Sequence, residues 1–160
     1  MQMRRLERSL TTLDEITAVL DKCLIARFGL VDAEGPYVVP VHFAYRLRDG
    51  RFTIYSHGAP TGRKIAALTA DPRCCVEIDR LDGLIDDGTG ACSLSAAYES
   101  VIGFGRARVV DDPQEAHEAI AAIVARQAPD QVSTLPDTLP AHVAIIAVDL
   151  DEVTGKTKRA

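Results

Sequence analysis

The residues whose types and spacing best suit chemistry lie in one stretch, YSHGAPTGRKIAAL at residues 55–68. An apolar strand ends there in three polar side chains, Tyr55, Ser56 and His57. Two glycines and a proline then predict a loop, and a helix opens with Gly62, Arg63 and Lys64. Helix N-termini carry unpaired amide donors and a partial positive charge, which favour anions. Arg63 and Lys64 are basic and oppose the helix dipole, so their position calls for another reason. We interpret them as binding a phosphate, and the alternative is that they are two solvated surface cations.

A second informative stretch is YVVPVHFAY at residues 37–45, which predicts a strand with two different faces. The period of two gives one face Val39, Val41, Phe43 and Tyr45, and the other Pro40, His42 and Ala44. Because proline cannot donate to a sheet ladder, Pro40 predicts a sheet edge or a bulge. A free edge beside a phosphate site could receive the edge of a flat heterocycle, and an ordinary edge strand is the alternative. Ser100, in a later strand, either binds a ligand or faces solvent.

These residues need a scaffold, and the hydrophobic pattern predicts six strands and three short helices. The strands are expected at 24–32, 37–47, 51–57, 73–79, 98–110 and 142–153, and the helices at 13–23, 63–70 and 113–128. Asp49-Gly50 predicts a tight hairpin, and Gly103 and Gly105 predict close backbone approach or a bulge. Residues 82–90 are rich in turn formers and expected to be exposed. We therefore expect a mainly β (α+β) fold, an antiparallel barrel with helices over its openings.

The 160 residues suit a single domain, with an N-terminal arm at 1–11 and a polar tail at 157–160. A net charge of −5 without a basic stripe argues against nucleic-acid binding, and no apolar run predicts a signal peptide or a membrane span. The four cysteines have no zinc-ligand spacing, so no metal site is expected. We expect them to be reduced thiols in a cytoplasmic protein. Neither a P-loop nor a dinucleotide-binding glycine motif is present.

Taken together, YVVPVHFAY, the Asp-Gly hairpin, FTIYSHGAPTGRKIAAL, DPRCCVEID and YESVIGFGRARVV resemble the pyridoxamine 5′-phosphate oxidase-related FMN-binding split barrels. Within them the chain is most similar to the branch of nitroimidazole-resistance flavoproteins. The similarity covers roughly residues 4–157 and depends on the order and spacing of the segments. It implies a six-stranded, Greek-key-like split barrel.

The resemblance also implies a homodimer with FMN at its interface, burying more than about 2,000 Å². It places the isoalloxazine ring along Pro40, Val41, His42 and Phe43. It brings ring and ribityl chain against Tyr55, Ser56 and His57, and the phosphate against Gly62, Arg63 and Lys64. Ser100 stands where the oxidases carry a ring-contacting glutamine. The terminal TGKTKRA offers no match to their substrate-binding arginine and histidine, so a true pyridoxamine-phosphate oxidase is not expected.

The expected function is a flavin-dependent reductase, in which FMN carries the redox chemistry. A reduced nicotinamide would supply the electrons and a small electron-poor acceptor, such as a nitroaromatic, would take them. In the similar branch a histidine at the place of His57 lies near the flavin, so this residue is the candidate proton donor. A flavin or haem carrier or sensor without turnover is the alternative, and a barrel that acts through its dimer surface alone is a third. Deazaflavin and haem stay open as other cofactors.

Overall fold

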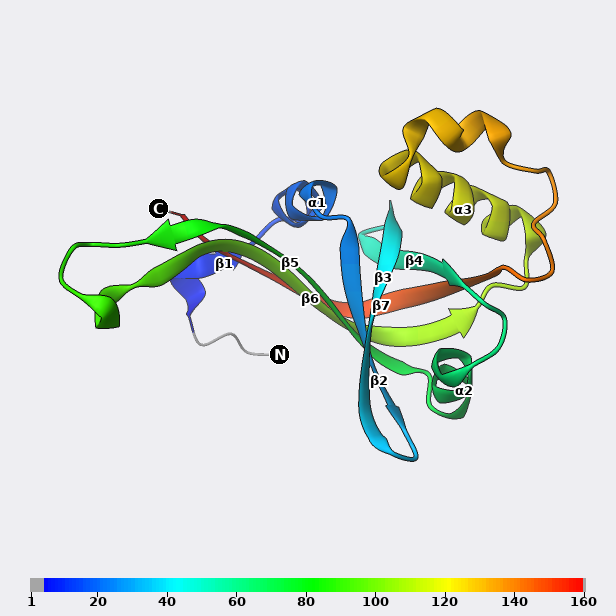
Figure 1. Ribbon diagram of the computed structural model, residues 1–160, viewed down its shortest axis with the longest axis horizontal. Helices are drawn as coiled ribbons and strands as arrows, with labels where there is room; N and C mark the ends of the chain where they lie inside the picture. Colours follow the sequence, from blue (N-terminus) through cyan, green and yellow to red (C-terminus); the bar gives the residue numbers. More distant parts are fainter. Residues whose placement is uncertain (1–4, 160) are drawn as a thin grey trace.

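Six long strands close into a barrel in the computed structural model, which describes residues 5–159 (Figure 1). They are β2 (Ile25–Asp32), β3 (Gly35–Arg48), β4 (Arg51–Gly58), β5 (Arg73–Ile85), β6 (Ser95–Val109) and β7 (Ala144–Lys158). Neighbours pair antiparallel in the order β7-β4-β3-β2-β5-β6, and a β6–β7 ladder closes the ring. The predicted six-stranded antiparallel barrel is confirmed. A two-residue strand, β1 (Ser9–Leu10), adds to β7 from the expected N-terminal arm.

Three α-helices in the described part of the chain flank the barrel, and their starts follow the sequence signals. They are α1 (Leu13–Lys22), α2 (Arg63–Ala70) and α3 (Pro113–Gln127), with short 3₁₀ helices at Leu6–Arg8, Ala91–Ser93 and Pro129–Thr134. At α1, Thr12 accepts from the Glu15 amide while the Glu15 carboxylate accepts from the Thr12 amide at 3.0 Å. At α3, Asp112 accepts from the Glu115 amide at 2.7 Å. Within residues 5–159, no helix is long and apolar enough to cross a membrane.

Two apolar clusters hold these elements together. The barrel interior contains Phe28, Phe43, Phe52, Ile54 and Ile146, each at most 2% exposed. Helices α1 and α2 add apolar side chains to this same cluster, so they cover the openings of the barrel. The second cluster lies between α3 and the outer side of β3, β4 and β7, and includes Ala44, Tyr55, Ile120, Ile123 and Ile145 (Figure 1).

Strand β3 gives the barrel its split, because its two halves pair with different strands. Residues 43–48 pair with β4, whereas residues 35–42 pair with β2. In the described part of the chain, no strand pairs with the second edge of residues 35–42. Pro40 lies in this half, opposite Arg27, so the predicted edge position is confirmed.

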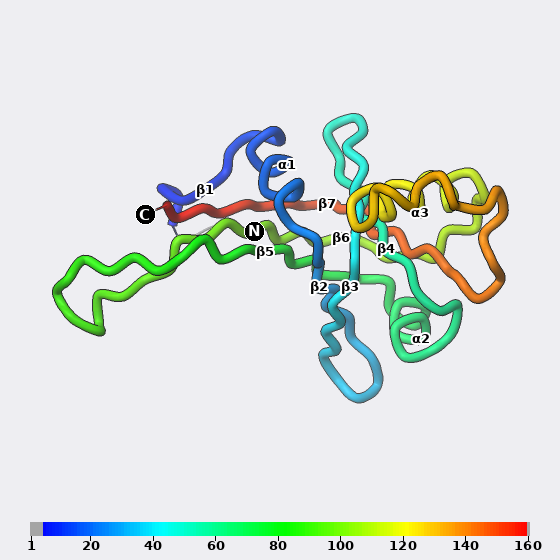
Figure 2. Tube along the Cα trace, turned by 45° about the horizontal axis from the view of Figure 1, so that its top comes forward, coloured from blue at the N-terminus to red at the C-terminus, as the bar shows by residue number. Residues whose placement is uncertain are grey.

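The strands β5, β6 and β7 are longer than the sequence pattern indicates. Residues 83–85 pair with Ser95–Ala97, so the expected turn-rich segment at 82–90 begins as strand and turns later. In the expected polar tail at 157–160, Thr157 and Lys158 pair with Glu99 and Tyr98, and Ala160 lies outside the described residues. Backbone pairing to a long neighbour stabilises polar sequence that shows no strand periodicity of its own. The ends of β5 and β6 form an arm that projects from the barrel (Figure 2).

The glycines of β6 mark a close approach to β7, as expected. The register between these strands shifts between Phe104 and Gly105. A side chain at Gly105 would overlap the carbonyl oxygen of Asp149, and one at Gly103 would press on Leu150. The backbone at the bulge therefore requires glycine at 105, whereas the contact at 103 is with the flexible end of the Leu150 side chain.

Candidate functional site

The candidate site begins where β4 ends and α2 starts. The loop at 59–62 leads into α2 through Gly62, whose φ of 112° suits glycine and strains other residues. Among residues 5–159, no side chain caps this end of α2. The first amides of a helix have no partner within the helix, so the end of α2 offers free N–H donors and a partial positive charge. It is suited to an anion.

Lys64 is the cation that this helix end leaves available. Its side chain is half-buried, and its Nζ lies so close to the backbone of β4 that a Cβ added at Gly58 would be 2.9 Å away. Desolvation by the surrounding protein lowers the pKa of Lys64. No hydrogen bond or ion pair of this ammonium is found with the described residues. A half-buried ammonium without a counter-charge is suited to an incoming anion.

Arg63 differs from its neighbour, because two carboxylates of the β2–β3 turn already hold it. Its Nε lies 2.6 Å from Oδ2 of Asp32, and its NH2 lies 3.2 Å from Oε2 of Glu34. The guanidinium carbon also lies 4.5 Å from the ring centre of Tyr37. The hydrogen bond from Arg63 lowers the pKa of Asp32. The sequence predicts Arg63 and Lys64 as two equivalent basic residues. In the structure Arg63 is held by carboxylates, whereas Lys64 is available to a ligand.

The edge of β3 lies beside this helix end in a group with two histidines. Val41 and Phe43 turn into the barrel core, whereas Pro40 and His42 are exposed on the outer face, as the period of two predicts. The β3–β4 ladder ends at the pair Phe43–Ser56, and His42 and His57 are the next residues on the two strands, just beyond that end. Partial desolvation, followed by the charges of His42 and Lys64, lowers the pKa of His57. This environment favours the neutral imidazole of His57 over the charged form.

The structure places the other expected site residues differently. Tyr55 turns towards α3, and its hydroxyl donates to Glu115 at 2.8 Å, so its backbone rather than its ring faces the site. Ser56 is fully buried, and its hydroxyl has no partner among the described residues. Ser100 lies on β6 between Asp79 and Lys156, on different strands from the histidine pair. Within one chain, strand pairing does not bring Ser100 next to His42 and His57.

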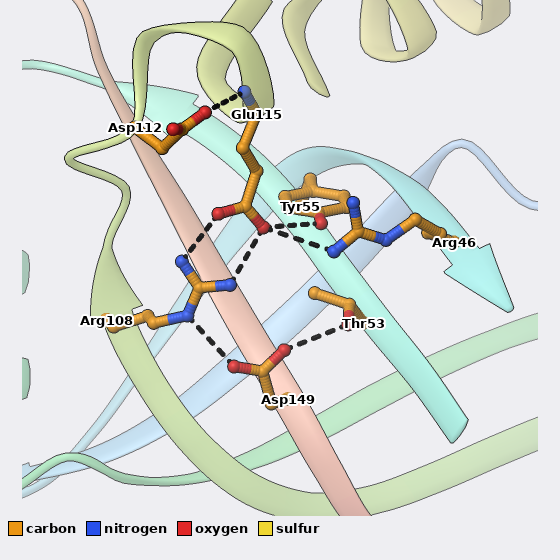
Figure 3. A network of polar contacts seen from close by, with 7 residues as sticks. All are labelled: Arg46, Thr53, Tyr55, Arg108, Asp112, Glu115 and Asp149. Carbon is orange, nitrogen blue, oxygen red and sulfur yellow. Dashed lines mark hydrogen bonds and ion pairs between the residues drawn. The ribbon is translucent and has the colours of Figure 1, made fainter. Parts of the chain in front are cut away.

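A polar network behind Tyr55 fixes α3 to the barrel (Figure 3). Glu115 accepts two hydrogen bonds from Arg108, at 2.9 and 2.8 Å, and one from Arg46 at 3.2 Å. Arg108 also donates to Asp149 at 2.9 Å, which in turn accepts from Thr53. These contacts saturate the carboxylate of Glu115, so the network is structural and positions β4, whose end carries His57.

This network predicts a pH-dependent stability. The hydrogen bonds from Arg108 lower the pKa of Glu115 to about 2. A lowered folded-state pKa gives stability above the unfolded value, and this stability is lost as the pH falls from about 5 to about 2. We expect Glu115→Gln to cost about 1–2 kcal/mol at pH 7, and the difference from wild type to shrink over that acid range. Thermal unfolding measures it, with Glu118→Gln, also on α3, as control. A difference independent of pH would contradict the assignment.

Comparison with protein families decides where the chain belongs. Residues 12–157 match the family described as pyridoxamine 5′-phosphate oxidase. The chain belongs to this family. No curated protein matches it.

Solved structures similar to this pyridoxamine 5′-phosphate oxidase family member share its barrel. A protein described as a 5-nitroimidazole antibiotic resistance protein, from Bacteroides thetaiotaomicron, is 30% identical with a TM-score of 0.76, over 92% of this chain and 85% of its own. The flavocytochrome Anf3 from Azotobacter vinelandii is 24% identical with a TM-score of 0.82, over 99% and 73%. The FAD and heme binding protein from Mycobacterium smegmatis is 22% identical with a TM-score of 0.80, over 96% and 74%.

Two residues of the site, Asp32 and Glu34, were not predicted from the sequence of this pyridoxamine 5′-phosphate oxidase family member. They lie in the turn VDAEG, between the first two strands of the meander. Two acidic residues in a hairpin turn next to a basic helix start are a signal for an ion pair. The fold is needed to bring them together, because 31 residues separate Arg63 from Asp32 along the chain.

Proposed function

We propose that this chain binds FMN at the N-terminus of α2 and along the free edge of β3. Two copies would form a homodimer that passes electrons from a reduced nicotinamide to a small electron-poor acceptor, such as a nitroaromatic. The observation that carries the proposal is the half-buried ammonium of Lys64, which has no counter-charge among the described residues and lies at an uncapped helix end. The cytoplasmic location expected from the cysteines belongs to the same proposal.

The donor set of this region fits the phosphate of FMN. A phosphate monoester is a compact anion with several acceptor oxygens, and it needs donors that converge on one point. Lys64 and the first amides of α2 supply them. Gly58 contributes by its missing side chain, which leaves the space that the Lys64 amine occupies. The buried hydroxyl of Ser56, without a partner among residues 5–159, is a further polar group on the strand that leads to this point.

The ring would lie along the unpaired edge of residues 35–42. Backbone N–H and C=O groups of an open strand edge alternate as donors and acceptors, as do the polar edge atoms of an isoalloxazine ring. Pro40 and His42 present their outer face there. Bound FMN would supply the electron-transfer chemistry, while this chain binds it, orients it and holds a proton at the imidazole of His57.

Similar structures support a flavin in preference to other phosphorylated ligands. Two of them are described as a flavocytochrome and as an FAD and heme binding protein, and a third as a 5-nitroimidazole antibiotic resistance protein. A flavocytochrome and a heme binding protein also point to haem, and the imidazoles of His42 and His57 are suited to iron. A flavin or haem carrier without turnover is therefore the second candidate.

The homodimer is proposed from the surface of the chain. The arm carries Leu81, Leu84 and Leu94, which are 66%, 73% and 48% exposed. Val38 on β3, beside the proposed ring site, is 62% exposed. Apolar side chains exposed to this degree on a projecting arm and on an open strand favour association. A symmetric dimer would cover these surfaces with the same surfaces of the second copy.

The absorption spectrum and sedimentation of the freshly purified protein test the proposal together. We expect flavin bands in the blue region, one flavin for each chain, and a species with the mass of two chains at micromolar concentration. A Soret band without flavin bands would replace this proposal by the haem carrier. Absence of both bands, with no binding of added FMN, would overturn flavin binding, and a species of single-chain mass would overturn the dimer.

A further inference from the structure

The carboxylates of Asp32 and Glu34 hold Arg63, and this affects which phosphate ligand the site accepts. Asp32 is mostly buried, with 16% of its side chain exposed, and its carboxylate also accepts from the Glu34 amide at 2.9 Å. The turn thus holds Asp32 in a fixed position against Arg63. Glu34 adds a second carboxylate to the same guanidinium, and Tyr37 covers its face. Two of the three guanidinium nitrogens of Arg63, Nε and Nη2, are therefore already held by carboxylates.

The charges at this helix end then favour a single phosphate. Arg63, Asp32 and Glu34 together carry a net charge of −1, and Lys64 alone carries an unpaired +1. One phosphate can use Lys64 and the free amides of α2. A second phosphate next to it would need Arg63, and it would bring further negative charge against Asp32 and Glu34.

We propose that Asp32 and Glu34 are specificity-determining residues, which keep Arg63 from the ligand and select a flavin with one phosphate over a flavin dinucleotide with a diphosphate. This inference rests on the proposed flavin site. Arg63 and Lys64 are consecutive in α2, yet one extends to the β2–β3 turn and the other to Gly58 of β4. The helix end therefore has an acidic side and a basic side, and the selectivity comes from that difference.

Titration of the protein with FMN, FAD and riboflavin, followed by flavin fluorescence, tests the inference. Wild type is expected to bind FMN at least about tenfold more tightly than FAD. The variant Asp32→Asn/Glu34→Gln frees Arg63 and removes two negative charges, so we expect its FMN-to-FAD preference to fall about fivefold or more, with riboflavin binding nearly unchanged. The variant Glu118→Gln/Asp137→Asn makes the same change of net charge on α3 and in the loop after it, and should keep the wild-type preference.

Each outcome of this experiment decides one of the two claims. If wild type binds none of the three flavins, the proposed function fails. If it binds them but prefers FAD, or if the Asp32→Asn/Glu34→Gln variant keeps the wild-type preference or shifts it no more than the control does, the inference is overturned while flavin binding stands. Thermal unfolding monitors the fold. Should the double variant unfold, Glu34→Gln alone is used, because Glu34 is 79% exposed at the turn and its loss should still lower the preference.

Discussion

Replacing Lys64 by alanine is expected to weaken FMN binding about ten- to a hundredfold and to leave riboflavin binding nearly unchanged. The reason is that a charged hydrogen bond to phosphate is lost, and riboflavin has no phosphate to make it. Burial strengthens the effect, since the half-buried Lys64 ammonium lies against the backbone of β4 with its pKa lowered by desolvation. Isothermal titration or quenching of flavin fluorescence gives both dissociation constants.

Two further variants show whether the effect belongs to this position. Lys156→Ala removes the same charge from β7 and should leave the ratio of FMN to riboflavin affinity as in wild type. Arg63→Ala should lower that ratio less than Lys64→Ala, because Asp32 and Glu34 already bind the guanidinium. Equal loss of both flavins in Lys64→Ala would mean that the ammonium does not bind the phosphate.

Local signals in the sequence were sufficient for the turns and helix starts. Asp49 and Gly50 adopt φ values of 52° and 77°, the conformation that a tight hairpin requires and that this residue pair favours. Thr12 and Glu15 form the expected capping box. These features depend on a few adjacent residues, so their physics is contained in the local sequence.

The extent of the arm could not be predicted in the same way. Gly83 and Leu84 show no alternation, and their strand conformation comes from pairing with Ala97 and Ala96. The end of β7 likewise depends on pairing with the start of β6, as in Lys158 with Tyr98, far away along the chain. Pairing between distant segments is a tertiary effect that periodicity does not report.

The candidate site was predictable in position but not in the roles of its side chains. The strand–loop–helix pattern predicted the start of α2, and Pro40 itself predicted the open strand edge. Sequence alone treats Arg63 and Lys64 as equivalent, and the difference between them depends on carboxylates from another hairpin. Similarly, the ring of Tyr55 is directed to Glu115 by the packing of α3. Partners far along the chain decide what a given side chain can bind.

Replacing His57 by alanine is expected to lower the rate of acceptor reduction by about 10²–10⁴-fold, the range for loss of a general acid. FMN affinity and reduction of the flavin by nicotinamide should change little, because hydride transfer to the flavin needs no proton from this imidazole. Stopped-flow absorbance measures the two half-reactions separately. His117→Ala, on α3, is the matched control and should leave both at the wild-type rate.

The pH dependence of acceptor reduction gives a second readout for His57. Its pKa lies below the ordinary 6.5, through desolvation and then through His42 and Lys64. An acid must be protonated to act, so the rate should fall as the pH rises through this lowered pKa. His42→Asn removes one of the causes and should move the fall to higher pH, whereas in His57→Ala it should disappear. Reoxidation of His57→Ala at the wild-type rate with every nitro compound and quinone tried would exclude the acid role. Loss of FMN from this variant would make His57 a cofactor ligand and favour the carrier.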